Sequence, residues 1–409
     1  MPWPYSLQCF DCHAEYPPNE TRYSCKKCGG LLEIRFRLRR LNNPAWKGRA
    51  LSVWKYRELL PIDSDRHVVT LSEGATGLHR CERLGKELGL RRLYVKNEGE
   101  NPTGSFKDRG MTVAVSKARE LGKRKLVCAS TGNTAASLAA YSARAGLDCL
   151  VFVPKGKVAE GKLLQVVIHG ARLIWIDGDF DKAMRSVSEL TDRRGDFYLM
   201  NSINPFRLEG QKTLAFEVCD QLGGKAPDAL VLPVGNGGNI SAIWKGFTEF
   251  QETGIVRNRP RMLGVQAEKA APIARAVKSG SSEVRPVKNP RTLATAIRIG
   301  SPVNSAKVLR AISESEGDAE TVSDSEILKA QRSLARLEGV FVEPASAASI
   351  AGLEKMVDKE IIDRSDLVVC VTTGHGLKDP SIVDRLPRSE GYTLKITEPD
   401  WVERLERRL

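Results

Sequence analysis

From about residue 93 onward, short apolar segments alternate with longer segments of helical periodicity, and this alternation constrains the fold more than any other feature. The apolar segments are continuous runs of Val, Leu and Ile, which is typical of strands buried on both faces of a sheet. They lie at residues 93–97, 125–130, 149–154, 172–177, 197–202, 228–234, 262–268 and 366–374. Repeated strand–helix–strand units form parallel sheets with helices on both faces. The sequence therefore predicts an α/β fold built on mostly parallel, doubly wound sheet.

Residues 6–40, ahead of this alternation, contain four cysteines arranged in two Cys-x-x-Cys pairs. The pairs are twelve residues apart and are formed by Cys9, Cys12, Cys25 and Cys28. This spacing is typical of a zinc ribbon, in which four thiolates hold one ion tetrahedrally. The alternative is a remnant of two such knuckles that folds without metal. We predict a zinc site, and a structural one, because four protein ligands leave no open position for catalysis.

The segment between the cysteines and the alternating region links this module to the main body. Residues 31–38 alternate apolar and charged side chains, as a half-buried strand does. Residues 42–50 have the composition of a linker, and residues 50–61 are expected to dock on the main body. We therefore divide the chain into a zinc-ribbon-like module with its linker, residues 1–45, and a main body, residues 46–409.

The composition, with 41% hydrophobic and 28% charged residues, is that of a soluble globular protein. No apolar run approaches the roughly 20 residues that a membrane span needs, and the N-terminus lacks the pattern of a secretory signal. We therefore expect a cytoplasmic protein, in which the other five cysteines are buried thiols rather than disulfides. The net charge of +13 is spread along the chain and suits small anions as well as nucleic acid. The charged residues 398–409 are expected to form a surface helix.

The stretch "ENPTGSFKDRG", residues 100–110, places a lysine at a junction between a strand and a helix. Lys107 follows the predicted strand 93–97 and a turn marked by Pro102 and Gly104, and it precedes a segment of helical periodicity. In α/β folds, ligands bind near such junctions. The alternative is a lysine at a helix N-terminus without a function, which the helix dipole disfavours slightly. On this stretch alone, both interpretations stay open.

Three further turns, rich in glycine, threonine or serine, also follow predicted strands. Residues 129–137 offer hydroxyl and amide side chains at a helix start, residues 233–241 offer closely spaced glycines, and residues 371–379 offer two adjacent threonines, Thr372 and Thr373. Glycines at a helix N-terminus let backbone N–H groups approach a phosphate. The glycine turn has neither the Lys-Ser/Thr of a P-loop nor the spacing of a dinucleotide fingerprint, so it favours a small phosphate group over ATP or NAD. Each turn taken alone could be an ordinary connection between a strand and a helix, without a function.

The lysine and the glycine turn together indicate a cofactor. A lysine amine can form an imine with an aldehyde, and the glycine turn can hold a phosphate. Pyridoxal phosphate carries both groups. We therefore predict pyridoxal phosphate as the cofactor, with Lys107 as its amine.

Seven motifs in combination resemble the threonine synthases, a family of pyridoxal-phosphate enzymes of fold type II. They are "ENPTGSFKDRG", "ASTGNTAAS", "NSINPFRLEGQKTLAFEV", "PVGNGGNI", "LATAIRIGSPVN", "EPASAASIAG" and "TTGHGLKDP", and the resemblance runs from about residue 50 to residue 385. The first motif alone is also similar to threonine dehydratases and to relatives of cysteine synthase, whereas "NSINPFRLEGQKT" and "TGHGLKDP" favour threonine synthase. The resemblance implies two doubly wound, mostly parallel α/β domains, with the smaller one, about residues 105–205, inserted in the larger.

The resemblance also implies which residues hold the cofactor. Lys107 corresponds to the lysine that forms the Schiff base, and Asn133 to the partner of the cofactor's phenolic oxygen. Thr373 corresponds to a hydroxyl that faces the pyridine nitrogen; such a neutral partner leaves that nitrogen unprotonated and the ring a weaker electron sink. The loop for the cofactor's phosphate corresponds to Gly235, Asn236, Gly237, Gly238 and Asn239.

For the substrate, the resemblance implies O-phospho-L-homoserine, which is converted with water into L-threonine and phosphate in the last step of threonine biosynthesis. The carboxylate contacts come from Ser130, Thr131 and Thr134, and the phosphate contacts from Asn201, Ser202 and Arg207. The fork of an arginine matches the geometry of a phosphate. Lys107 would take the α-proton as general base, so its pKa must lie well below the ordinary ~10.4.

Two other functions are compatible with parts of the sequence. A dehydratase acting on serine or threonine would share the cofactor residues, but it has no substrate phosphate for Arg207 to bind. A zinc ribbon followed by a basic stretch, residues 35–49, could bind nucleic acid, although only Phe36 and Trp46 could stack on bases. We expect a homodimer that acts on a small molecule, with neither a nucleic-acid nor a membrane partner.

Overall fold

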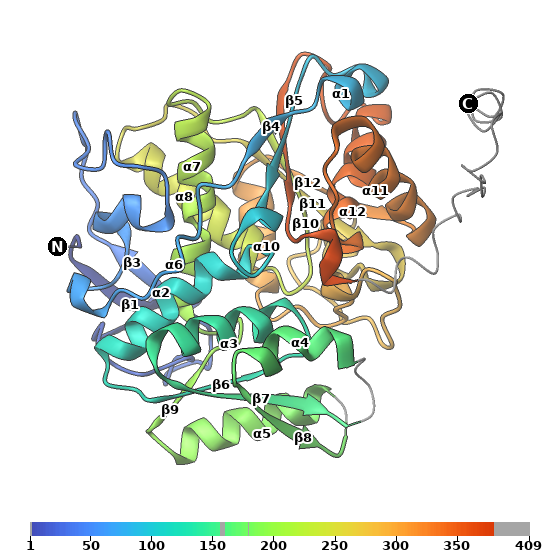
Figure 1. The fold of residues 1–409 in the computed structure, drawn as a ribbon. Coiled ribbons are helices and arrows are strands. Elements are labelled where there is room, and N and C mark those ends of the chain that lie inside the picture. Colours follow the sequence, from blue (N-terminus) through green and yellow to red (C-terminus); the bar gives the residue numbers. More distant parts are fainter. Residues whose placement is uncertain (1, 156–159, 179, 380–409) are drawn as a thin grey trace, which may run out of the picture. The chain divides into compact units, whose positions relative to one another are not determined.

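The structure, a computed structural model, describes residues 2–155, 160–178 and 180–379 (Figure 1). In this part of the chain there are three sheets. None of the helices described there has the length and hydrophobicity of a membrane span. The surface helix expected at residues 398–409 falls outside the described residues.

The largest sheet has six strands in the order β12-β11-β10-β13-β5-β4. The bounds of its strands are β4 Leu78–Arg80, β5 Arg92–Asn97, β10 Ala229–Pro233, β11 Arg261–Ala267, β12 Asp318–Val322 and β13 Leu367–Thr372. Neighbouring strands are parallel, except that β4 runs antiparallel to β5 at the edge. Alternate side chains of β10 enter different cores, Val231 on one face and Leu230 and Leu232 on the other. Both faces are therefore buried, as the apolar runs predicted.

Helices cover the two faces of this sheet in separate groups (Figure 1). One face packs against α1 (Glu82–Leu88), α11 (Asp324–Glu338) and α12 (Pro344–Asp358). The other packs against α7 (Thr213–Gln221), α8 (Gly238–Glu252), α9 (Pro272–Lys278) and α10 (Ser305–Glu314). At the start of α11, Ser323 and Glu326 form a capping box that satisfies the first backbone N–H groups.

The second sheet has four parallel strands in the order β8-β7-β6-β9. Its strands are β6 Lys125–Ala129, β7 Asp148–Pro154, β8 Arg172–Ile176 and β9 Phe197–Leu199. One face packs against α5 (Phe180–Arg193). The other packs against α2 (Lys107–Glu120), α3 (Asn133–Ala145), α4 (Glu160–Ile168) and α6 (Pro205–Gln211). Each of the eight predicted strands is confirmed in one of these two sheets.

The cysteine module is a small antiparallel sheet in the order β2-β1-β3, with β1 Tyr5–Cys9, β2 Glu15–Tyr16 and β3 Leu32–Phe36. Its buried side chains Leu7 and Ile34, which face each other across β1 and β3, share a core with Met111 of α2. The module therefore packs directly on the helix that begins with Lys107.

The segment expected to be a linker is anchored in the core. Trp46 is 2% exposed, and its ring stacks on Phe250 of α8, with centroids 6.2 Å apart and planes within 10°. It also meets Tyr56, which lies in the expected docking segment, edge to face. The 3₁₀ helices that complete the fold are η1 Val53–Leu59, η2 Asp65–His67, η3 Glu98–Glu100, η4 Glu268–Ala270, η5 Thr295–Ile297 and η6 Gly376–Lys378.

Candidate active site

Lys107 is the first residue of α2 and lies beside the carboxyl end of β13. The backbone N–H of Phe106 donates to the carbonyl of Thr373 at 3.0 Å, and Ser105 forms a single antiparallel bridge with Gly374. The Lys107 ammonium lies 4.0 Å from the centre of the Phe106 ring. Two motifs that are far apart in the sequence, "GSFKDRG" and "TTGHG", are therefore joined by backbone pairing.

The residue after Lys107 ties this helix start to its surroundings. Asp108 accepts hydrogen bonds from the backbone N–H and the hydroxyl of Thr103, both at 2.7 Å, and from the hydroxyl of Ser137 in α3 at 2.5 Å. Burial raises the pKa of Asp108 to about 6, although these three donors act in the opposite direction. The turn, α2 and α3 are thus held in one arrangement by a single carboxylate.

Arg109, the next residue, belongs to a fully buried ionic network. Its guanidinium pairs with Glu98 at 2.5 Å and with Glu217 of α7 at 2.8 Å, and Lys96 of β5 pairs with Glu217 at 2.9 Å. None of these four side chains is exposed to solvent. Burial alone would raise the pKa of Glu217, but the positive charges of Arg109 and Lys96 outweigh it and hold the pKa at about 2. The network fixes α2 against the larger sheet.

The Lys107 amine is poised to be neutral near physiological pH. Its side chain keeps some exposed area, but the surrounding protein removes most of its hydration. This desolvation, together with the positive charge of Arg207, lowers the pKa of Lys107 to about 7, while the carboxylate of Glu343 opposes the shift. Above pH 7 the amine is therefore mostly unprotonated, which is the form that attacks an aldehyde or accepts a proton.

The serine- and threonine-rich turn lies between β6 and α3, opposite the end of β13. Asn133 begins α3, and its amide donates to both carboxylate oxygens of Glu343 at 3.1 Å. Near them is Gly374, since a Cβ added there would lie 2.7 Å from Glu343 Oε1 and 3.3 Å from Asn133 Nδ2. The hydroxyl residues of the same turn, which are all half-buried, are Ser130, Thr131 and Thr134.

The glycine loop between β10 and α8 packs closely against α6 and α10. Gly237 has a φ of +82°, and a Cβ at this position would lie 2.3 Å from Val308. At Gly238 a Cβ would lie 3.2 Å from Leu208 of α6 and 3.6 Å from Asn304 Nδ2. Glycine is therefore required at Gly237 by backbone conformation and by space.

Several buried polar groups gather around this loop. Among the described residues, the side-chain amides of Asn239 and Asn304 and the carbonyl oxygen of Gln211 have no hydrogen-bond partner. Buried groups of this kind normally have one. Free amide donors beside a glycine loop at a helix N-terminus suit an anion, so these residues fit the phosphate of pyridoxal phosphate. The loop Gly235, Asn236, Gly237, Gly238 and Asn239 lies where the sequence predicted it.

Thr373 follows β13 and is held from α12. Its hydroxyl lies 2.9 Å from that of Ser346, and the Ser346 hydroxyl also accepts from the backbone N–H of Gly374 at 2.8 Å. Neither side chain carries a charge. A ring nitrogen placed against this pair would meet a neutral hydroxyl, as expected from the sequence.

Arg207 lies in α6 and is 2% exposed. One of its terminal nitrogens, Nη1, donates to the carbonyl of Met200 at 3.0 Å, and its Nε has no partner among the described residues. No carboxylate in this part of the chain forms an ion pair with it, and desolvation lowers its pKa to about 10. A buried guanidinium without a counter-charge is unfavourable by itself, so the site is suited to an anion.

Asn201 and Ser202, predicted beside Arg207, are placed differently from each other. The Asn201 side chain accepts from Ala129 N–H at 3.0 Å and donates to Ala129 O at 2.9 Å, so it fastens the end of β9 to β6. Ser202 is half-buried in the turn before α6. One N–H donor of Asn201 is therefore used within the protein, and the other is left for a ligand.

Some residues of the site were missed by sequence reasoning. Glu343, Ser346 and Asn304 lie within quoted motifs, "EPASAAS" and "SPVN", but were given no role; Glu343 precedes Pro344 and resembles an ordinary residue before a helix. Lys378, which donates to Thr103 O at 2.9 Å, was also missed. Desolvation lowers the pKa of Lys378, so a second amine of reduced basicity lies close to the turn before Lys107.

The four cysteines predicted to bind zinc are brought together in the small antiparallel sheet. The sulfur atoms of Cys9, Cys12, Cys25 and Cys28 all lie within 4.8 Å of one another. The Cys9–Cys28 and Cys12–Cys25 pairs are 3.4 and 3.5 Å apart. Four thiolates about 2.3 Å from one tetrahedral zinc ion would be roughly 3.8 Å apart, so the arrangement fits such an ion.

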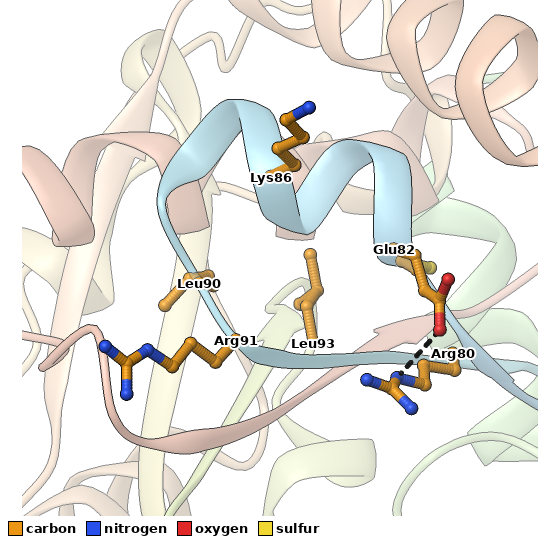
Figure 2. A pocket seen from close by; sticks show the side chains of 7 residues that line it. Arg80, Glu82, Lys86, Leu90, Arg91 and Leu93 are labelled. Atoms are coloured by element: carbon orange, nitrogen blue, oxygen red, sulfur yellow. Dashed lines mark ion pairs between the residues drawn. The ribbon is translucent and has the colours of Figure 1, made fainter.

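Cavities on the larger sheet are separate from these residues. One of about 220 Å³ lies between α1 and the β4–β5 edge, and its lining includes Arg80, Lys86 and Leu93 (Figure 2). Arg80 is already paired with Glu82 at 3.3 Å. None of the predicted site residues lines this cavity, so we do not assign the chemistry to it.

Comparisons with known proteins agree with this geometry. Residues 69–374 match the family described as "Pyridoxal-phosphate dependent enzyme". Threonine synthase of Methanocaldococcus jannaschii is 55% identical over 382 residues, which cover 92% of this chain and 94% of that protein. Threonine synthase of Mycobacterium tuberculosis is 52% identical over 325 residues, 80% of this chain and 88% of that protein.

Solved structures of lower identity share the fold. The processed form of threonine deaminase isoform 2 from Solanum lycopersicum is 23% identical, with a TM-score of 0.65, over 76% of this chain and 86% of that one. Maize serine racemase is 19% identical, also with a TM-score of 0.65, over 81% of this chain and 93% of that one. The similarity covers most of the chain and agrees with the motifs. This chain therefore belongs to the threonine synthase family of fold-type II pyridoxal-phosphate-dependent enzymes.

Proposed function

We propose that this protein converts O-phospho-L-homoserine and water into L-threonine and phosphate. The observation that carries the proposal is Arg207, a buried guanidinium that has no carboxylate partner among the described residues and whose charge acts on Lys107. A phosphorylated substrate would supply the missing negative charge. A dehydratase acting on serine or threonine has no such group, so it would leave the cost of burying Arg207 without compensation.

We propose the cofactor residues that the family resemblance implies, and the glycine loop supports them. Pyridoxal phosphate, when bound, supplies an aldehyde that forms imines with amines and a conjugated ring that accepts electrons from the substrate. We assign its phosphate to the backbone N–H groups of residues 235–239, with Asn304 close by. Asn133 would bind its phenolic oxygen, and Thr373, held by Ser346, would face its ring nitrogen.

The remaining side chains act on the substrate. Lys107 Nζ, neutral near pH 7, would take the proton from the substrate's α-carbon and hold it for return. The hydroxyls of Ser130, Thr131 and Thr134, at the N-terminus of α3, would donate to the carboxylate. Arg207, with Ser202 and the remaining donor of Asn201, would bind the phosphate and stabilise it as it leaves.

A direct assay tests this function. The purified protein, loaded with pyridoxal phosphate, is incubated with O-phospho-L-homoserine, and inorganic phosphate and L-threonine are measured. Parallel incubations with L-serine and L-threonine are assayed for 2-oxo acids. Equimolar phosphate and threonine support the proposal. Formation of 2-oxo acids without phosphate release would instead identify a dehydratase.

Reconstitution of the apoprotein should show the lowered pKa of Lys107. Because only the neutral amine attacks an aldehyde, the rate of imine formation should rise between about pH 6 and 8 and then level off. The measurement is the imine absorbance after adding pyridoxal phosphate, with borohydride reduction and peptide mapping to confirm Lys107 as the labelled residue. A rate that still rises about tenfold from pH 8 to 9 would indicate an ordinary lysine with a pKa near ~10.4.

We further propose that Cys9, Cys12, Cys25 and Cys28 hold one structural zinc ion per chain. Replacing Cys9 and Cys12 with serine should remove the metal and increase hydrogen exchange in residues 6–40, because the ion supplies folding free energy to a small module. The imine absorbance should persist. Cys81→Ser, which changes a buried thiol outside the cluster, is the matched control and should retain zinc. Metal analysis that finds no zinc in protein purified without chelators would contradict the assignment.

We also propose a cytoplasmic homodimer, and a boundary near residue 45 between the module and the body, as expected from the sequence. Nucleic-acid binding by the basic stretch 35–49 is disfavoured by the placement of its two aromatic side chains. Phe36 packs beneath the Lys212 ammonium at 4.3 Å, and Trp46 is buried. Neither ring is free to stack on a base.

A further inference from the structure

The cysteine module contacts the segment that leads into α6 and carries Arg207. That segment begins in β9, the edge strand of the four-stranded sheet. Residues of an edge strand have backbone groups that no neighbouring strand satisfies. At Leu199 this group is the N–H, which donates to the hydroxyl of Tyr23 at 2.8 Å. Tyr23 therefore closes the edge of the sheet with a side chain from the module.

Tyr23 is held both by its place in the sequence, next to the cysteine cluster, and by the packing of its ring. It stands two residues before Cys25, one of the four clustered cysteines. Its ring packs edge to face on Tyr198 of β9, with centroids 5.9 Å apart. The hydrogen bond to Leu199 and the ring contact with Tyr198 therefore hold Tyr23 against β9 at two points.

Three further hydrogen bonds connect Leu199 and the next residue, Met200, with α6 and Arg207. The carbonyl of Leu199 accepts from the side chain of Asn204 at 2.8 Å, and Asn204 caps α6 by accepting from Phe206 N–H at 3.0 Å. The next carbonyl, that of Met200, accepts from Arg207 Nη1 at 3.0 Å. The carbonyl of Leu199 therefore sets the start of α6, and the carbonyl of the next residue, Met200, sets the orientation of the guanidinium.

The module holds α6 from a second side as well. Lys245 of α8 donates both to the carbonyl of Ile34 in β3 and to Glu209 of α6, two residues after Arg207. Lys212, next to α6, also pairs with Glu209, at 2.6 Å, and lies over the ring of Phe36 in β3. Both ends of α6 are therefore linked to the module.

We propose that Tyr23 is a positioning residue for the substrate's phosphate, acting through Leu199 and Met200 on Arg207. This inference rests on the proposed function, in which Arg207 binds that phosphate. The cysteine cluster fixes the position of Tyr23, and the Tyr23 hydroxyl in turn fixes the backbone that leads to the binding site. Removing its hydroxyl leaves the Leu199 N–H unsatisfied and frees the segment that orients the guanidinium.

The test uses the holoenzyme with Tyr23→Phe, which keeps the ring and removes only the hydroxyl. The KM for O-phospho-L-homoserine and the Ki for inorganic phosphate should both rise about three- to tenfold, as for loss of one buried hydrogen bond. The kcat should stay within about twofold. The imine absorbance and the zinc content should not change. Tyr5→Phe is the matched control, since its hydroxyl also joins the module to the body, at Lys117 and Pro61, but makes no hydrogen bond to Leu199 or Met200. It should leave the Ki unchanged.

A double-variant cycle with Arg207→Ala shows whether Tyr23 acts through that residue. In the Arg207→Ala background, Tyr23→Phe should add no further increase in the Ki. If Arg207→Ala raises the Ki and Tyr23→Phe does not, the inference is wrong and the proposed function stands. If neither changes it, the phosphate site itself is wrongly assigned.

A second measurement covers the case in which Tyr23→Phe does not fold. In the unmodified holoenzyme, saturating inorganic phosphate should slow hydrogen exchange both in residues 199–207 and in residues 22–25 of the module. Protection confined to residues 199–207 would show that Tyr23 is not coupled to the phosphate site and would overturn the inference.

Discussion

Lys107→Ala should reduce threonine formation by at least about a thousandfold, because the variant lacks both the amine that forms the imine and the general base. The loss of the imine should be visible directly, as the disappearance of its absorbance band from protein equilibrated with pyridoxal phosphate. The fold should survive, since α2 is held by Asp108 and Arg109 rather than by Lys107. The measurements are steady-state phosphate release and an absorbance scan of the same sample.

A lysine in the turn after the same helix serves as the control. The Lys123 ammonium donates to the carbonyl of Gly195 at the surface, so Lys123→Ala should retain the absorbance band and the activity. Borohydride reduction of the wild-type protein should attach the cofactor to Lys107. A label on any other lysine would refute the assignment of the reactive amine.

Arg207→Ala should lower turnover of O-phospho-L-homoserine by at least about tenfold. Charge-assisted hydrogen bonds contribute about 1.5–3 kcal/mol, and each 1.4 kcal/mol corresponds to a factor of about ten. The effect should appear mainly in kcat/KM, since the guanidinium acts both at binding and as the phosphate leaves. The imine absorbance should be unchanged, because in the proposed site Arg207 does not contact the cofactor.

Two further variants sharpen this result. Arg207→Lys should recover only part of the loss, because a point charge cannot reproduce the two parallel hydrogen bonds of a guanidinium. Arg193→Ala, in an exposed ion pair with Glu189 on α5, should behave like the wild type. Undiminished phosphate release by Arg207→Ala would remove this residue from the site and favour the dehydratase.

The central strands could be predicted because they are apolar on both faces, and that signal is independent of their neighbours. The two edge strands of the six-stranded sheet, β12 and β4, could not. β12, with the sequence "DAETV", alternates acidic and apolar residues, and its buried Glu320 is accepted only because Lys278 and Lys359 pair with it. β4 has three residues and forms only against β5. Both depend on tertiary contacts that the local pattern does not contain.

In the candidate site, too, some residues could be predicted from the sequence and others could not. Lys107 and the glycine loop were predicted because each follows a strand at the edge where parallel sheets bind ligands, whereas Asn133 was assigned by the family resemblance. Glu343 and Asn304 reach the site from segments before α12 and α10, where nothing local marks them as functional. The packing of the module on α6 was equally inaccessible, because it depends on carbonyl groups of β3 and on charges from α8.

The buried ion pairs beside Lys107 also limit how this part of the sequence can change during evolution. Arg109, Glu98, Glu217 and Lys96 come from three segments, and loss of any one leaves a buried net charge that neither a counter-charge nor water compensates. A single replacement would therefore destabilise the fold until a second one compensated for it. We infer that these four positions are inherited as a set, so that drift in the surrounding sequence proceeds around them while the reactive helix keeps its place.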